Sequence, residues 1–248
     1  MAVSAFSAQK RRAPDTAQAT DTATLTRRLV AEGLGTAFLL AAVVGSGIMG
    51  ERLAGGNVAI ALLANSLATA GALVILILVF GPVSGAHLNP AVTLAMALRR
   101  ETRWADVPAY LAVQVVGAII GVAAAHIMFE APLFSLSTHV RAGPAQMFSE
   151  FIATFGLLAV IVGCARHRAQ AIPYAVACYI GAAYWFTAST SFANPAVTIA
   201  RALTNTFSGI RLADVPEFVV AQIAGAAGAV LLFGWLLPRQ LGEREQNR

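Results

Sequence analysis

Long apolar runs separated by short polar turns make up most of this 248-residue chain. A helix that spans a lipid bilayer needs about 20 predominantly apolar residues. Six segments reach or approach that length: 29–49, 58–80, 108–129, 146–164, 171–188 and 215–237. Apolar residues account for 58% of the chain and charged residues for only 12%, which is unusual for a soluble domain. The pattern therefore predicts an all-α integral membrane protein with six transmembrane helices.

Two polar breaks follow the second and the fifth apolar runs, and both contain the tripeptide Asn-Pro-Ala. The two copies are Asn89-Pro90-Ala91 and Asn194-Pro195-Ala196. Asparagine is a good helix N-cap and proline is favoured at the first helical position, so each copy predicts the start of a short helix. We expect two re-entrant half-helices, one from 89 to about 99 and one from 194 to about 203.

Further motifs recur in the two halves of the chain. Glu32 and Thr36 are echoed by Glu150 and Thr154, and the segments 106–108 and 114–117 are echoed by 214–216 and 222–225. Each half contains three spans, an odd number, so the second half is inserted upside down relative to the first. Inverted repeats with broken helices place a transport site near the bilayer midplane.

The repeats also predict the domain organisation. Residues 1–26 read as a disordered cytoplasmic tail, 27–238 as a channel domain with repeats at about 27–130 and 146–238, and 239–248 as a second cytoplasmic tail.

The basic residues indicate how the chain is oriented. With an internal N-terminus, thirteen of the seventeen Lys and Arg residues fall inside, and only Arg52, Arg141, Arg201 and Arg211 fall outside. This is the asymmetry of the positive-inside rule. The net charge of +5 is therefore a topology signal, and we expect no nucleic-acid partner. The expected location is the cell (inner) membrane, with both termini cytoplasmic.

The two predicted half-helices would meet with their N-termini at mid-membrane. Each helix N-terminus carries roughly half a positive charge, which disfavours cations but leaves N–H donors for a neutral polar solute. Non-helical backbone at that depth is tolerated where it lines water, so the backbone before each asparagine is a candidate pore lining. In the first half these residues are Gly85, Ala86, His87 and Leu88.

Together, the twin Asn-Pro-Ala motifs, the segment 84–87 and the paired Glu32 and Glu150 resemble the aquaporin and aquaglyceroporin (major intrinsic protein) family over about residues 27–238. The resemblance implies the aquaporin-like fold and a homotetramer with one pore per subunit. The sequence contains no evident nucleophile–base pair or phosphate-binding loop, so we expect neither enzymatic activity nor a cofactor. The resemblance also implies that the two glutamates brace the re-entrant loops and that His87 faces the cytoplasmic half of the pore.

One part of the family pattern is missing. Family members usually narrow at four positions that include an arginine directly after the second Asn-Pro-Ala, and here that residue is Val197. Counting along the ungapped match gives Thr69, Ala182 and Ser191 as the other three. Valine supplies neither the donors nor the positive barrier of a guanidinium. The expected constriction is therefore wide and uncharged. Thr198 and Ala202 also stand where glycerol channels usually carry Asp and Arg.

This departure resembles the aquaglyceroporin-like channels of bacterial arsenic-resistance operons. The resemblance implies arsenite as cargo, neutral at pH 7 as the trihydroxide, with methylated arsenicals as a second class. A broader pore for glycerol, urea, ammonia or water is the alternative. Two different classes of membrane protein also stay open. One is a non-conducting scaffold, against which the intact Asn89 and Asn194 argue, and the second is a coupled transporter, which would need a further intramembrane carboxylate.

Overall fold

The computed structural model describes residues 23–237, and every regular element in that range is helical. This range contains six long helices, two short ones and three single turns. Their order is α1 (Leu25–Leu53), α2 (Val58–Ser84), α3 (Pro90–Leu98), η1 (Trp104–Asp106), α4 (Val107–Met128), α5 (Pro144–His167), η2 (Ala169–Ala171), α6 (Ile172–Phe186), α7 (Pro195–Arg201), η3 (Leu212–Asp214) and α8 (Val215–Leu236). The predicted order of six spans and two half-helices is confirmed. The predicted tail 239–248 lies outside the described residues. So does most of the tail 1–26, of which only the end is described, with α1 starting at Leu25.

Within residues 23–237, five helical segments are long and apolar enough to cross a bilayer on their own: α1, α2, α5, and α4 and α8 with the single turns before them. Helix α6 has only 15 residues, fewer than the 171–188 span that the sequence predicts. The single turn η2 precedes α6 directly and lengthens the helical segment. The all-helical membrane architecture therefore holds, with one span shorter than expected.

Helix α2 runs past residue 80, where the predicted apolar segment ends. It continues through Pro82 to Ser84 and stops at Gly85, which adopts a left-handed conformation with φ of +89°. The Gly85 amide donates to the Gly81 carbonyl. Proline lacks an N–H and usually interrupts a helix, but here it lies in the last turn. Glycine adopts positive φ without a steric penalty, so Gly85 is the true stop.

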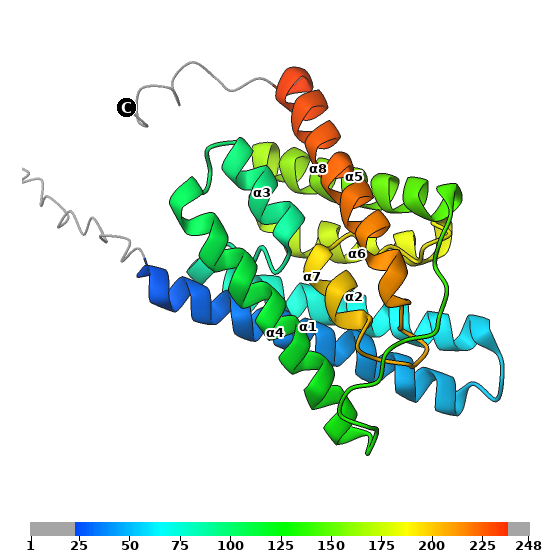
Figure 1. Cartoon of the computed structure of the whole chain (residues 1–248). Helices are drawn as coiled ribbons and strands as arrows, with labels where there is room; N and C mark the ends of the chain where they lie inside the picture. Colours follow the sequence, from blue (N-terminus) through cyan, green and yellow to red (C-terminus); the bar gives the residue numbers. More distant parts are fainter. Residues whose placement is uncertain (1–22, 238–248) are drawn as a thin grey trace, which may run out of the picture.

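The two halves of the chain pack in the same way. Helix α1 packs against α2 and α4, while α5 packs against α6 and α8. Each short helix crosses to the other half, since α3 contacts α8 and α7 contacts α4. Figure 1 shows α7 in the middle of the view, with the longer helices around it. The repeat seen in the sequence is therefore a repeat of contacts, and its two half-helices meet inside the bundle.

Glycine allows the closest approach between paired helices. A Cβ added at Gly117 on α4 would collide with the Gly33 carbonyl on α1, and one at Gly225 on α8 would collide with the Phe151 carbonyl on α5. Both glycines belong to the segments that recur in the two halves. Small residues at such crossings let helix backbones approach closely in lipid.

Candidate functional site

A cavity of about 320 Å³ runs between the helices, past both Asn-Pro-Ala turns. Residues four apart on one helix line the same wall, as the helical repeat requires. These stripes are Leu39 and Val43; Thr69, Leu73 and Ile77; Val92 and Met96; Leu157, Ile161 and Ala165; Ile172, Val176, Ile180 and Tyr184; and Val197 and Arg201. Glu101 also lines the cavity, and we name its two ends the Glu101 end and the Arg201 end.

The two asparagines hold the half-helices together at the centre. Asn89 caps α3 by accepting from the Ala91 amide, and its Nδ2 donates to the Ala193 carbonyl at 2.7 Å. Asn194 caps α7 in the same way, and its Nδ2 donates to the Leu88 carbonyl at 2.8 Å. Each Nδ2 carries two hydrogens, so one donor per asparagine remains. Both asparagines line the cavity, while the prolines and alanines of the motifs are buried and absent from its lining.

The backbone before each asparagine is strained. Ala86 and Leu88 have positive φ, and so do Ser191 and Ala193 at the equivalent places in the second half. Side-chain-bearing residues rarely adopt this left-handed conformation, which costs free energy unless surrounding contacts fix it. The four predicted lining residues of the first loop, Gly85, Ala86, His87 and Leu88, do line the cavity.

Glu32 fixes the first loop. Its Oε1 accepts from the His87 amide and from the Ser84 hydroxyl, and its Oε2 accepts from the Leu88 amide at 2.7 Å. The carboxylate is fully buried. Because a carboxylate only accepts, it satisfies several N–H and O–H donors that would otherwise be buried without partners. These are the bracing hydrogen bonds that the resemblance implied.

Glu150 fixes the second loop with the same geometry. Its two oxygens accept from the amides of Phe192 and Ala193, each at 2.9 Å. Gln222 on α8 donates to Glu150 and also to Thr198 on α7. The sequence marks Gln222 as part of a repeated motif without giving it a role. The structure shows that it links the brace to the half-helix.

Gln114 plays the same part in the first half. It donates to Glu32 and to Thr93 on α3. Thr93 in turn donates to the Asn89 carbonyl and lies 3.1 Å from the His87 ring nitrogen Nδ1. The His87 ring is thereby tied to the half-helix and lines the cavity.

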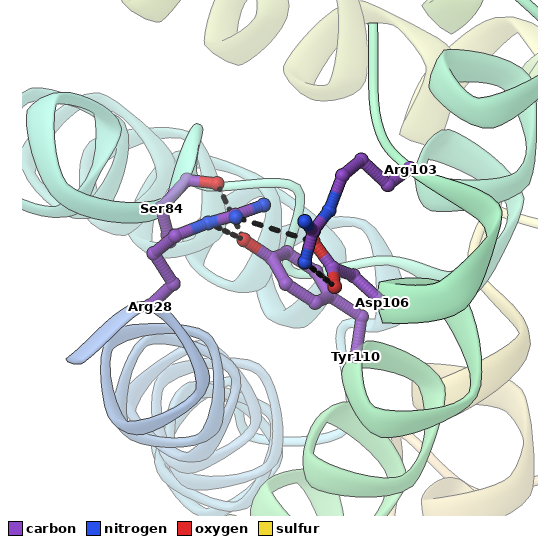
Figure 2. Close-up of polar contacts among 5 residues, drawn as sticks. All are labelled: Arg28, Ser84, Arg103, Asp106 and Tyr110. Atoms are coloured by element: carbon purple, nitrogen blue, oxygen red, sulfur yellow. Dashed lines mark hydrogen bonds and ion pairs between the residues drawn. The ribbon is translucent and has the colours of Figure 1, made fainter. Parts of the chain in front are cut away.

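A polar cluster anchors the first loop near the Glu101 end, as Figure 2 shows. Arg28 donates to the Tyr110 hydroxyl at 2.8 Å, and Tyr110 donates to the Ser84 carbonyl at 3.1 Å. The Asp106 carboxylate accepts hydrogen bonds from the side chains of both Arg28 and Arg103. These contacts join α1, α2, η1 and α4. The end of α2 therefore cannot move without breaking buried polar contacts.

Arg141 anchors the second loop near the Arg201 end. Its side chain donates to the carbonyls of Gly209 and Ser189, and its backbone amide donates to Asp214. Burial lowers the pKa of the Arg141 guanidinium, and the nearby Glu150 carboxylate opposes that shift. An arginine remains charged through a shift of this kind. A positive charge therefore lies beside the second loop.

Three of the four predicted constriction residues line the cavity: Thr69, Ser191 and Val197. Ala182 does not, because its side chain is exposed on the outside of the chain. Two residues along a helix correspond to about 200°, so Ala182 points away from the wall formed by Ile180 and Tyr184. The residue that the ungapped count selects on α6 therefore does not line the cavity.

Tyr184 is the α6 residue that lines the cavity beside Thr69. Its hydroxyl lies 3.2 Å from the Thr69 hydroxyl. The Ser191 hydroxyl is buried without a hydrogen-bond partner among the described residues. Hydroxyl groups can both donate and accept, so Thr69 and Tyr184 offer contacts to a hydroxylated solute in this part of the cavity. The four-residue spacing from Ile172 to Tyr184 was the sequence signal for this tyrosine.

Arg201 is the second residue that the sequence does not place at the site. The sequence assigns it to the outer residues, but it ends α7, is buried and lines the cavity. Its guanidinium carbon lies 3.4 Å from the centre of the Phe192 ring, and its Nε donates to the Ser208 carbonyl. The cavity is therefore not uncharged, although position 197 is.

With this geometry in hand, comparisons with known proteins decide the family. The profile of the family described as "Major intrinsic protein" matches residues 19–187, more than half of the chain. The chain belongs to the major intrinsic protein family. It is a multi-pass membrane protein and a solute channel of this family, and it is not an enzyme.

The chain is 55% identical over 213 residues to "Aquaglyceroporin AqpS" of Rhizobium meliloti (strain 1021), covering 86% of this chain and 91% of that one. It is 39% identical over 145 residues to "Aquaporin NIP3-1" of Oryza sativa subsp. japonica, covering 57% of this chain but only 45% of the plant protein. The X-ray structure of the aquaglyceroporin from Plasmodium falciparum covers 85% of this chain with a TM-score of 0.65 and 20% identity. That structure confirms the aquaporin-like fold.

Proposed function

We propose that this chain is a passive channel for small neutral solutes and that arsenite, as the neutral trihydroxide, is its main cargo. The observation that carries the proposal is Val197, which lines the cavity directly after the second Asn-Pro-Ala. Valine takes up less room than arginine and adds no charge or donor at this level. A compact solute with several hydroxyl groups can then pass without losing its hydrogen bonds, since Tyr184, Thr69 and the asparagines offer partners.

The walls of the cavity suit a solute with both polar and apolar sides. The stripes of α2, α5 and α6 are largely aliphatic, while hydroxyl and amide groups lie along the re-entrant loops. Methylated arsenicals, which carry methyl groups beside hydroxyls, would therefore also fit. Flow through such a channel is passive and follows the gradient, outward when arsenite is produced inside the cell.

The proposed location is the cell (inner) membrane, with the Glu101 end of the cavity facing the cytoplasm. The positive-inside rule supports this orientation, because Arg99, Arg100 and Arg103 lie at that end and Arg52 at the other. A homotetramer with one pore per subunit is the proposed assembly. It would cover part of the apolar surface that the single chain exposes on its long helices.

Glycerol is the strongest alternative cargo, because the relative from Rhizobium meliloti is named as an aquaglyceroporin. A non-conducting scaffold is less well supported. Asn89 and Asn194 both line the cavity and each retains one donor hydrogen. A closed scaffold has no need of such donors.

Arsenite uptake into vesicles tests the proposal through position 197. We expect Val197→Arg to reduce arsenite flux at least about 10-fold, since a long guanidinium would fill the passage and add a charge. Val197→Thr is the matched control, because it keeps the size of valine without a charge, and it should keep most of the flux. Equal arsenite flux in Val197→Arg and wild type would contradict the assignment.

A further inference from the structure

We propose that Arg201 forms a positive barrier that keeps cations out of the channel, in place of the guanidinium that position 197 lacks. The inference rests on the proposed channel function and adds to it a residue that decides charge selectivity. Val197 explains how neutral solutes enter. It leaves open what stops small cations from following them.

Arg201 shares one face of α7 with Val197. It lies four residues after Val197 on α7 and lines the cavity with it. Residues four apart share one face of a helix, so Arg201 meets the cavity one turn further toward its end. Its side chain is held by the Phe192 ring and by the Ser208 carbonyl, and the residue is only 2% exposed.

The Arg201 side chain has hydrogen-bonding capacity that its contacts do not use. A guanidinium carries five N–H donors, and the hydrogen bond to Ser208 uses only the one on Nε. Within residues 23–237, no acceptor meets the two terminal amino groups. The two amino groups keep a small accessible surface, and Arg201 lines the cavity.

Arg201 also forms no direct ion pair with a carboxylate in residues 23–237. None of the ion pairs between described residues involves it. Glu150 accepts only from neutral groups, the amides of Phe192 and Ala193 and the Gln222 side chain, so its negative charge offsets part of the positive field at this end. Asp214 is paired with Arg211 and also accepts from the Arg141 amide. Glu51, which lies near this end, accepts from the Phe207 amide.

Arg141 adds to the same field. Its guanidinium carbon lies 5.1 Å from the centre of the Phe192 ring that Arg201 also contacts. The hydrogen bonds of its side chain go to two neutral carbonyls. The guanidinium groups of Arg141 and Arg201 thus both lie against the Phe192 ring beside the cavity. Fixed charges at a low-dielectric constriction repel ions of the same sign strongly and leave neutral solutes largely unaffected.

The test measures potassium conductance and arsenite flux in the same vesicle preparation. We compare wild type, Arg201→Gln and Arg201→Lys, with Arg52→Gln as the matched control, since Arg52 is exposed and lies outside the cavity lining. We expect wild type, Arg201→Lys and Arg52→Gln to pass arsenite but no potassium. Arg201→Gln should pass arsenite and show potassium conductance at least about 10-fold above wild type.

Several outcomes would overturn the barrier. If Arg201→Gln passes arsenite and still excludes potassium, the barrier is wrong and the proposed function stands. If wild type shows an anion conductance that Arg201→Gln loses, Arg201 recruits anions and is not a barrier. If wild type passes no solute, the proposed function fails and the barrier fails with it. Should Arg201→Gln not assemble, Arg201→Met keeps the contact with Phe192 and is judged by the same result.

Discussion

Val197 and Arg201 lie on successive turns of α7, and both line the cavity. Val197 adds no charge to the passage at the level of the second Asn-Pro-Ala, whereas Arg201 carries a guanidinium one helical turn later. Room for a solute and a positive charge at the cavity are therefore supplied by two different residues. An arginine at the first position would supply the charge there but leave less room for a solute.

The assignment of Tyr184 to the cavity and of Ala182 to the outer surface can be tested with cysteine labelling. In a background of Cys164→Ser and Cys178→Ser, Tyr184→Cys should react with a small neutral hydrophilic maleimide and lose solute flux. Ala182→Cys should react at least about 10-fold more slowly, because its side chain points away from the cavity wall. If labelling of Ala182→Cys blocked solute flux and labelling of Tyr184→Cys had no effect, Ala182 would be the constriction residue, as the ungapped count predicts.

Replacement of Glu150 tests the brace of the second loop. Glu150→Gln puts an amide donor where two backbone amides need acceptors, so at least one buried N–H loses its partner. We expect a loss of about 1–3 kcal/mol in stability, seen as a lower thermal midpoint in detergent, together with reduced flux. Glu217→Gln, the same change at an exposed position on α8, should alter neither. Equal midpoints for the two variants would show that the brace contributes little.

The Tyr110 hydroxyl should couple the start of α1 to the first loop. Tyr110→Phe removes the acceptor of Arg28 and the donor to the Ser84 carbonyl, so we expect a lower thermal midpoint. In a double-mutant cycle, Tyr110→Phe and Arg28→Gln should couple by at least about 0.5 kcal/mol. Tyr174→Phe at an exposed position is the control. Fully additive effects would mean that the contacts in Figure 2 act independently.

The fold could be predicted from the sequence because its strongest signals are local and repeated. Long apolar runs have few alternatives to spanning helices in a membrane, and an Asn-Pro pair both caps and starts a helix. The end of α2 was harder to predict, since Pro82 is a common helix stop but the helix continues to Ser84 and ends where Gly85 takes the left-handed conformation.

Most of the candidate site was predictable as well, but the residues of the constriction were not. The glutamates and asparagines stand out as polar residues in apolar surroundings. Tyr184 and Ala182 are both compatible with α6, and only the rotation of that helix decides which one meets the cavity. The place of Arg201 depends on how far α7 extends and on the contacts with Phe192 and Ser208, which no local pattern encodes.

The most direct test of a passive arsenite channel is flux through the wild-type chain itself. Purified protein in sealed vesicles would be given arsenite, glycerol and water gradients side by side, with empty vesicles as the reference. We predict that arsenite equilibrates rapidly in either direction without an ion gradient, and that glycerol follows more slowly. Arsenite flux at the level of empty vesicles while glycerol or water passes would contradict the arsenite assignment, and no flux of any solute would contradict the channel.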